Sequence, residues 1–408
     1  MMRALSRLPA VVLLCLCVNA RAQDAALRMS EAKALAALQA ELQRRSTTDE
    51  FSGAVLIAKE GKAIFQMAYG AANREQKVAN TLATPFRFGS MGKMFTGVAV
   101  LQLVQAGRVG LSDPLSKYLP DYPNRSIANA SLHQLLTHTA GTGDIFTPEY
   151  DARRGEMKEL QDYVALYGAR RPDFDPGLKH EYSNYGFILL GRVIEVVSGQ
   201  RYADYVREHI FKPAGMLATD NLPEAQVKNL AIPYSSGVMR RRLLPPLEPG
   251  ADTPNGAPPL LRGMAAGEQL SPMAAGDAPE TQTSLRSVVA ELPYSGSSAG
   301  GGYTTVGDLL KFAIALQSYK LLDAQHTQLL TTGKVATPRA NLQYAYGFED
   351  ARSSDGVRRL GHGGGTAGVN GELSIFPESK YTVIVLANRD PPAADEVASF
   401  INERLPAE

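Results

Sequence analysis

The chain has 408 residues, of which 44% are hydrophobic and 20% are charged. This composition allows a large buried core and excludes a globally disordered chain. Lys and Arg together number 42 and Asp and Glu number 41, a balance that excludes the strongly basic surface of a typical nucleic-acid-binding protein. The length allows two or three domains, or one large domain with insertions.

The first 22 residues have the pattern of a secretory signal peptide. Arg3 and Arg7 precede the apolar run Leu8–Val18, and Ala20-Arg21-Ala22 matches a small-x-small cleavage site. A membrane anchor is the alternative, but this run is too short to cross about 30 Å of hydrocarbon as a helix. We therefore predict cleavage after Ala22, a mature domain over 23–408, and an exported, periplasmic protein.

Both cysteines, Cys15 and Cys17, lie inside this predicted signal peptide. The predicted mature chain has no thiol, which excludes disulfides, cysteine ligands to zinc and a cysteine nucleophile. An exported protein without disulfides must rely on a large core. That requirement suits a bacterial periplasmic enzyme better than a small eukaryotic secreted module.

The two ends of the predicted mature chain mirror one another. Apolar spacing predicts a helix over 25–46, and two β runs over 53–70 are hinged at Glu60-Gly61-Lys62. The C-terminal part predicts two β runs and a helix over 371–376, 381–387 and 393–405. The simplest arrangement joins both ends in one antiparallel sheet with both helices on one face.

The middle of the chain is mostly helical by its apolar periodicity. Helices are predicted over 91–106, 160–169, 185–198, 202–210 and 306–318. A sheet built from the two ends around a helical middle indicates one interrupted domain of mixed α/β (α+β) class. The stretch 245–259, with six prolines, predicts a long surface loop within an insertion over about 236–290.

The first candidate motif is Phe88-Gly89-Ser90-Met91-Gly92-Lys93, between a β-like stretch and an apolar predicted helix. With Ser90 at the helix start and Lys93 three residues later, both side chains share one helix face. A serine hydroxyl becomes a good nucleophile when a base takes its proton, and a desolvated lysine can be neutral and serve as that base. For an isolated match, an N-cap serine with a solvated lysine is the alternative interpretation.

The second candidate motif is Tyr182-Ser183-Asn184, just before the predicted helix 185–198. Tyrosine is a plausible base only beside a cation that favours its phenolate form. Asn184 can donate to a substrate carbonyl and orient a lysine. A helix cap beside a half-buried tyrosine is the alternative for this tripeptide alone.

The third candidate motif runs from Gly361 to Gly368 and contains His362-Gly363-Gly364-Gly365. Glycines let a substrate lie close to a strand edge and leave backbone N–H groups free. His362 can donate to a substrate carboxylate or to developing negative charge, and with an ordinary pKa it would attract carboxylates more strongly on acidification. The same glycines match a dinucleotide-binding pattern, but a β run follows them where that fingerprint requires a helix.

Other catalytic patterns do not fit. His133 and His138 lack the His-Glu-x-x-His spacing of zinc proteases, and we interpret His138 as a structural hydrogen-bonding residue. Phe88 breaks the Gly-x-Ser-x-Gly pattern around Ser90 that α/β-hydrolases use. We therefore expect no metal and no cofactor.

Together and in this order, the three motifs resemble those of the serine β-lactamase and penicillin-binding protein superfamily: Ser-x-x-Lys, Tyr-x-Asn and Lys/His-x-Gly. The tyrosine is similar to the class C branch, with its D-alanyl-D-alanine carboxypeptidase and esterase relatives. Connecting stretches such as Leu135–Gly141 and Ala299–Thr305 also resemble the family, and the resemblance covers about 50–390. It implies an antiparallel sheet flanked by helices, beside a mostly helical lobe, with the site between them.

The resemblance also implies roles for the motif residues. Ser90 would be the acylated nucleophile, and Lys93 and Tyr182 the proton-transfer network. Asn184, His362 and Gly364 would bind the substrate. The oxyanion hole would consist of the backbone N–H groups of Ser90 and Gly365.

The expected activity is that of an exported serine hydrolase, acting on an amide or ester carbonyl of a small-molecule or peptide substrate. D-amino-acid peptides, β-lactams and esters all stay open as substrates. His-Gly-Gly, where class C β-lactamases usually have Lys with Thr or Ser, favours the carboxypeptidase and esterase relatives. The alternative is a catalytically weak or inactive binding protein of the same fold, for cell-wall peptides or β-lactams. The complete set of Ser90, Lys93 and Tyr182 argues against it.

Overall fold

The computed structural model describes residues 27–237 and 284–407. The predicted signal peptide and most of the predicted insertion lie outside these residues. The largest element is an eight-stranded sheet in the order β2-β1-β14-β13-β12-β11-β10-β9, and every neighbouring pair is antiparallel. Its strands are β1 (Gly53–Lys59), β2 (Lys62–Tyr69), β9 (Val335–Ala336), β10 (Leu342–Tyr344), β11 (Glu349–Arg352), β12 (Arg358–Thr366), β13 (Val369–Ile375) and β14 (Tyr381–Ala387).

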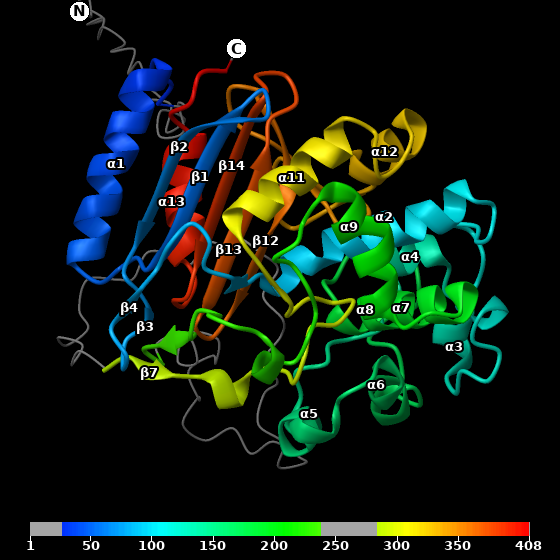
Figure 1. Ribbon diagram of the computed structural model, residues 1–408. Coiled ribbons are helices and arrows are strands. Elements are labelled where there is room, and N and C mark those ends of the chain that lie inside the picture. Colours follow the sequence, from blue (N-terminus) through cyan, green and yellow to red (C-terminus); the bar gives the residue numbers. More distant parts are fainter. Residues whose placement is uncertain (1–26, 238–283, 408) are drawn as a thin grey trace, which may run out of the picture.

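The two ends of the described chain pair with each other in this sheet, as its second and third strands. Strand β1 pairs with β14 in continuous register from Gly53 opposite Ala387 to Lys59 opposite Tyr381. Helices α1 (Glu31–Thr47) and α13 (Ala393–Asn402) pack on one face, beside each other (Figure 1). The predicted joining of both ends, with both helices on one face, is therefore confirmed.

Alternation along the central strands divides the core into two layers. In β1, Val55 and Ile57 point to the layer under α1 and α13, whereas Ala54 and Leu56 point to the other layer. Because successive side chains of a strand face opposite sides, a strand covered on both faces must be apolar at every position. All seven residues of β14 are accordingly buried.

The second layer joins the sheet to a helical region, which lies on the other side of the sheet from α1 and α13 (Figure 1). Helix α11 packs against β1 and β14, and α2 runs from the sheet into the helical region. Between β5 (Phe86–Arg87) and β12, the described residues form the α-helices α2 (Gly92–Gln105), α3 (Arg125–Ala128), α4 (Leu132–Leu136), α5 (Pro148–Arg153), α6 (Leu160–Tyr167), α7 (Asn184–Ser198), α8 (Tyr202–Val206), α9 (Lys212–Ala214), α11 (Val306–Gln317) and α12 (Ala324–Thr331).

Within the part of the chain that the structure describes, three short ladders lie outside the large sheet. They pair β3 (Ala71–Asn73) with β4 (Val78–Ala79), β5 (Phe86–Arg87) with β8 (Tyr303–Thr304), and β6 (Tyr234–Ser235) with β7 (Arg286–Ser287). The β5–β8 ladder brings the segment just before Ser90 next to the segment after Ala299. No helix among the described residues is long and apolar enough to cross a bilayer.

The predicted elements differ from the structure at three functionally relevant places. The helix predicted over 91–106 begins as the 3₁₀ turn η1 (Gly89–Met91), and α2 starts only at Gly92. The helix predicted over 202–210 is divided into α8 and a π-helical turn over Arg207–Phe211. The glycine motif at 361–368 leads into the strand β13, as predicted, but its own residues up to Thr366 also belong to a strand, β12.

Candidate active site

Ser90 lies on η1, at the point where the chain passes from the sheet side into α2. Gly89 has a φ of +53°, and the Gly301 N–H donates to its carbonyl at 3.1 Å. A positive φ costs glycine little, so this residue allows the sharp turn that presents the serine. Ser90 is partly exposed, whereas Lys93, one turn later, is fully buried.

Three oxygen atoms lie within hydrogen-bond distance of the Lys93 amine. Its Nζ lies 2.6 Å from Asn184 Oδ1, 2.7 Å from the Ala299 carbonyl oxygen and 3.3 Å from Ser90 Oγ. The first two groups can only accept, and they take the two N–H bonds of a neutral amine. The remaining lone pair is then free to accept the Ser90 hydroxyl proton. Burial lowers the pKa of Lys93 to about 7, which makes this neutral form accessible near neutral pH.

The Asn184 amide connects Lys93 to an acidic residue, Asp144. Its Nδ2 donates to the Asp144 carboxylate at 3.0 and 3.3 Å, while its Oδ1 faces Lys93. Asn184 is the first residue of α7, and the preceding Ser183 caps this helix through a hydrogen bond from the Gly186 N–H. The cap holds Asn184 at the helix start, where its side chain reaches the lysine.

Tyr182 covers the other side of Lys93. The Lys93 amine lies 4.7 Å from the Tyr182 ring centroid. Burial raises the pKa of Tyr182 far above its usual value, although an interaction with the Ser90 hydroxyl opposes this shift. Its buried hydroxyl has no hydrogen-bond partner of ordinary geometry among the described residues. The structure therefore contains a neutral phenol beside the candidate nucleophile, and not the phenolate that we considered.

His362 lies behind Tyr182 and is fully buried. Its Nδ1 faces the Gly363 carbonyl oxygen, which can only accept, so Nδ1 carries the proton. Its Nε2 then accepts from the Tyr344 hydroxyl at 3.0 Å. Burial and the Lys93 charge lower the pKa of His362 to about 3.

This placement changes the role that we expected for His362. Because both ring nitrogens are occupied, the ring has no N–H to offer to a substrate carboxylate. Because its pKa is depressed, it also gains no charge on mild acidification. In this structure the His362 side chain holds Tyr344 and the start of the glycine motif in place behind the site.

The glycines of β12 bring this strand against η1. A methyl group built on Gly364 would lie 2.1 Å from the Phe88 carbonyl oxygen and 3.0 Å from the Ser90 nitrogen. One built on Gly89 would lie 3.0 Å from the Gly365 nitrogen. The two amides expected to form the oxyanion hole, those of Ser90 and Gly365, therefore belong to two backbones in van der Waals contact.

Strand β12 also has a free edge at this point. It pairs with β13 along 360–366, but with β11 only as far as Gly361. Gly365 is exposed on this edge, next to Ser90. An unpaired strand edge offers backbone hydrogen-bonding groups with which another extended backbone can pair.

Two participants were missed by sequence reasoning: Asp144 and the Ala299 carbonyl. Both lie in loops that no periodicity describes. The run of glycines after Ala299 is a sequence signal for a close approach of two backbones. The structure shows the reason, because Gly300 has a φ of +134° and a methyl group built on it would lie 2.2 Å from the Gly89 carbonyl oxygen. Asp144 follows Gly141-Thr142-Gly143, which indicates only a turn.

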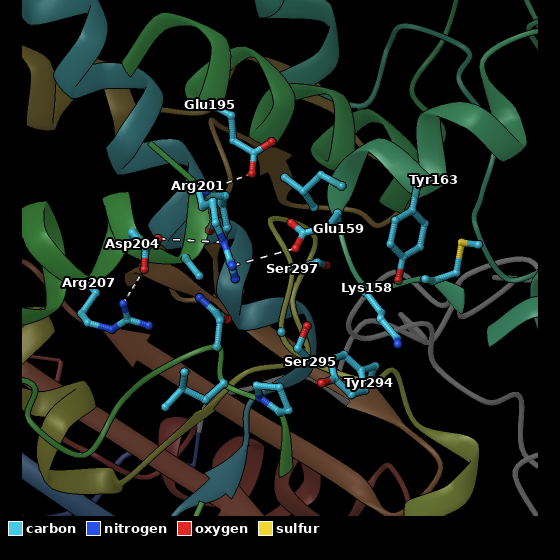
Figure 2. Close-up of a pocket in the computed structure, with 18 of the residues that line it drawn as sticks. Lys158, Glu159, Tyr163, Glu195, Arg201, Asp204, Arg207, Tyr294, Ser295 and Ser297 are labelled. Carbon is cyan, nitrogen blue, oxygen red and sulfur yellow. Dashed lines mark hydrogen bonds and ion pairs between the residues drawn. The ribbon is translucent and has the colours of Figure 1, made fainter. Parts of the chain in front are cut away.

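A separate cavity of about 520 Å³ lies in the helical region (Figure 2). It is lined by parts of α6, α7 and α8 and by Tyr294–Ser297, and it contains none of the predicted site residues. In this cavity the Arg201 guanidinium lies 3.9 Å from the carboxylates of both Glu159 and Asp204, so its positive charge is balanced by negative charges. The buried Lys93 amine beside the Ser90 hydroxyl lies outside this cavity, and we therefore take Ser90 and its surroundings as the candidate active site.

Several known proteins resemble this chain in sequence and in fold. Over 185 residues the chain is 29% identical to penicillin-binding protein 4* of Bacillus subtilis (strain 168), covering 45% of this chain and 40% of that protein. The structure of a penicillin-binding protein from Bacillus halodurans superposes with a TM-score of 0.71 and 28% identity, over 88% of this chain and 98% of that one.

A D-stereospecific amidohydrolase from Streptomyces sp. has the same fold, with a TM-score of 0.67 and 24% identity over 90% of this chain and 97% of that one. The chain matches less than half of the length of the curated relative, whereas it covers nearly all of both solved structures. The family model named Beta-lactamase matches residues 36–408. The chain therefore belongs to the Beta-lactamase family.

Proposed function

We propose that the chain is a serine hydrolase that forms an acyl-enzyme on Ser90. The observation that carries this proposal is the environment of Lys93, because two pure acceptors take its N–H bonds and leave its lone pair to the Ser90 hydroxyl. A buried lysine that can be neutral near pH 7 is suited to remove a proton from serine.

In the proposed acylation, Lys93 accepts the Ser90 proton while Oγ attacks the substrate carbonyl carbon. The Ser90 and Gly365 N–H groups stabilise the resulting oxyanion. The C–O or C–N bond to the leaving group then breaks, and the leaving group receives a proton that passes from Lys93 through the neutral Tyr182 hydroxyl. In deacylation a water molecule gives a proton to the same groups while its oxygen attacks the acyl carbon. The bond between Ser90 Oγ and the acyl carbon then breaks, the proton returns to Oγ, and the acid leaves.

Several findings support an amide or ester of D-amino-acid type as the substrate. One structural neighbour is named a D-stereospecific amidohydrolase, and other relatives are named penicillin-binding proteins. The buried, neutral His362 supplies no positive charge for a substrate carboxylate, so neutral amides and esters are the substrates that this site favours. We also propose, from the N-terminal pattern alone, that the protein is exported and cleaved after Ala22.

The experiment is a turnover assay with a D-amino-acid amide, its L enantiomer, a p-nitrophenyl ester and a chromogenic cephalosporin. Wild type should hydrolyse the D-amide or the ester faster than the cephalosporin, and Ser90→Ala should lose turnover while keeping its melting temperature. Turnover that survives in Ser90→Ala would contradict the proposal. Binding of all four compounds without turnover in wild type would favour the binding-protein alternative.

A further inference from the structure

Asp144 lies in the loop between α4 and α5, beside the candidate active site but outside all three sequence motifs. Its carboxylate accepts hydrogen bonds from amide groups: Asn184 Nδ2 at 3.0 Å and the Ile145 N–H at 2.6 Å. The neighbouring Arg170 guanidinium donates to the backbone carbonyls of Thr142 and Asp144 and not to this carboxylate. Burial raises the pKa of Asp144, but the hydrogen bonds from Asn184 and Ile145 and the Lys93 charge oppose this shift and favour the ionised carboxylate. In that form Asp144 places a negative charge near Lys93, separated from it by one amide group.

The carboxylate determines how the Asn184 amide is oriented. A carboxylate only accepts, so it requires the NH₂ end of the amide, and the oxygen must then face Lys93. In the opposite orientation an N–H of Asn184 would face the N–H bonds of the lysine. Asp144 therefore maintains the acceptor that takes one Lys93 hydrogen, and indirectly it keeps the amine lone pair directed at Ser90.

The charge of Asp144 also acts on Lys93 over a short distance. Burial lowers the pKa of Lys93, and the Asp144 charge raises it again. The other titratable groups around the lysine are Tyr182, His138 and His362, and burial holds all three in their neutral forms. On the far side of Asp144, Tyr167 also has a raised pKa and is neutral. Asp144 is thus the anion whose removal changes the lysine most directly.

We propose that Asp144 is a positioning residue that fixes the Asn184 amide and sets the pH at which Lys93 becomes the base. This inference rests on the proposed acylation of Ser90. Asp144 makes two contributions, a hydrogen bond that orients Asn184 and a negative charge, and two substitutions distinguish them. Asp144→Asn keeps an acceptor oxygen for Asn184 but removes the charge, whereas Asp144→Ala removes both.

The test is the pH dependence of kcat/KM for the best substrate of the turnover assay, in wild type and both variants. On the acidic side of this profile kcat/KM rises as Lys93 loses its proton, and we call this rise the acidic limb. In Asp144→Asn the acidic limb should move to lower pH by roughly one unit, because the charge that favours protonated Lys93 is gone. Asp144→Ala should show the same shift and in addition a loss in kcat of about 10-fold or more at every pH, because the amide can rotate.

Asp173→Asn is the matched control, because Asp173 is an exposed acid on the adjacent segment. It should leave the limb unchanged. Melting temperatures and the fraction of molecules labelled by a fluorophosphonate exclude misfolding as the cause. If wild type has the limb and Asp144→Asn keeps it at the same pH, the inference is wrong even though the hydrolase proposal stands. If wild type is neither labelled nor active, the hydrolase proposal itself fails.

Discussion

The chemistry of this site depends on one buried amine and its three neighbours. Ser-x-x-Lys spacing alone predicts that Ser90 and Lys93 share a helix face, and the structure has them 3.3 Å apart. Spacing does not predict the two acceptors, Asn184 and the Ala299 carbonyl, that bind the N–H groups of the amine. They come from segments 91 and 206 residues away along the chain.

The first prediction concerns Lys93. Since burial lowers its pKa to about 7, the fraction of neutral lysine rises as the pH increases through that value. We expect kcat/KM to increase with pH between about 6 and 8, with an apparent pKa near the lysine value. Lys93→Arg, which stays charged throughout, should lose at least about 100-fold in rate and show no such limb. A flat wild-type profile over this range would mean that a neutral Lys93 is not the base.

The second prediction concerns His362. With a pKa lowered to about 3, this ring stays neutral at any pH above about 4. The preference between a substrate carboxylate and its methyl ester should therefore stay constant from about pH 5 to pH 8, apart from effects common to both substrates. The measurement is the ratio of kcat/KM for the matched pair. A preference for the acid that grows on acidification would show that His362 does reach the substrate carboxylate.

At the scale of elements, the contact between β12 and η1 is the feature that sequence patterns described least well. Glycine is rare in strand interiors, so His362-Gly363-Gly364-Gly365 does not have the composition of a strand. The close approach of Phe88 and Ser90 explains Gly364, because no side chain fits there between the two backbones. By contrast, the strand predicted over 381–387 has the observed bounds of β14, because β-branched and apolar residues fill it.

The third prediction follows from this contact. Gly364→Ala introduces a methyl group 2.1 Å from the Phe88 carbonyl oxygen, so β12 and η1 must separate. We expect kcat to fall by about 100-fold or more, since an oxyanion hole works only when both donors keep their positions. Gly155→Ala is the control, because nothing lies within 4 Å of its new methyl group. Equal activity of the two variants, measured as kcat per labelled molecule, would contradict the role of this contact.

At the scale of the whole molecule, the pairing of both chain ends in one sheet was predictable from the mirrored order of elements. Every second residue of β1 and β14 faces α1 and α13, and these apolar side chains form the layer under the two helices. The arrangement of the helical region was not predictable, because its short helices are joined by loops whose paths depend on packing. Asp144 lies in one of these loops, which is why no pattern identified it.

The fourth prediction separates this sheet layer from the active site. Ile401 of α13 is fully buried on the face opposite to Ser90. Ile401→Ala should lower the free energy of unfolding by about 2–5 kcal/mol through lost contacts and a residual cavity. Guanidinium unfolding measures this, with Val196→Ala, at a position that is 48% exposed, as the control. Below the melting temperature kcat should be unchanged, and a large fall in kcat would show that the two layers are not independent.

The central claim is that Ser90 is the nucleophile activated by Lys93, and covalent labelling tests it most directly. The protein is incubated with a fluorophosphonate, and the adduct is located by intact mass and peptide mapping. The account predicts one adduct per molecule, on the peptide that contains Ser90, absent from Ser90→Ala and formed at least about 100-fold more slowly in Lys93→Arg. An adduct on another residue, or undiminished labelling of Ser90→Ala, would contradict it.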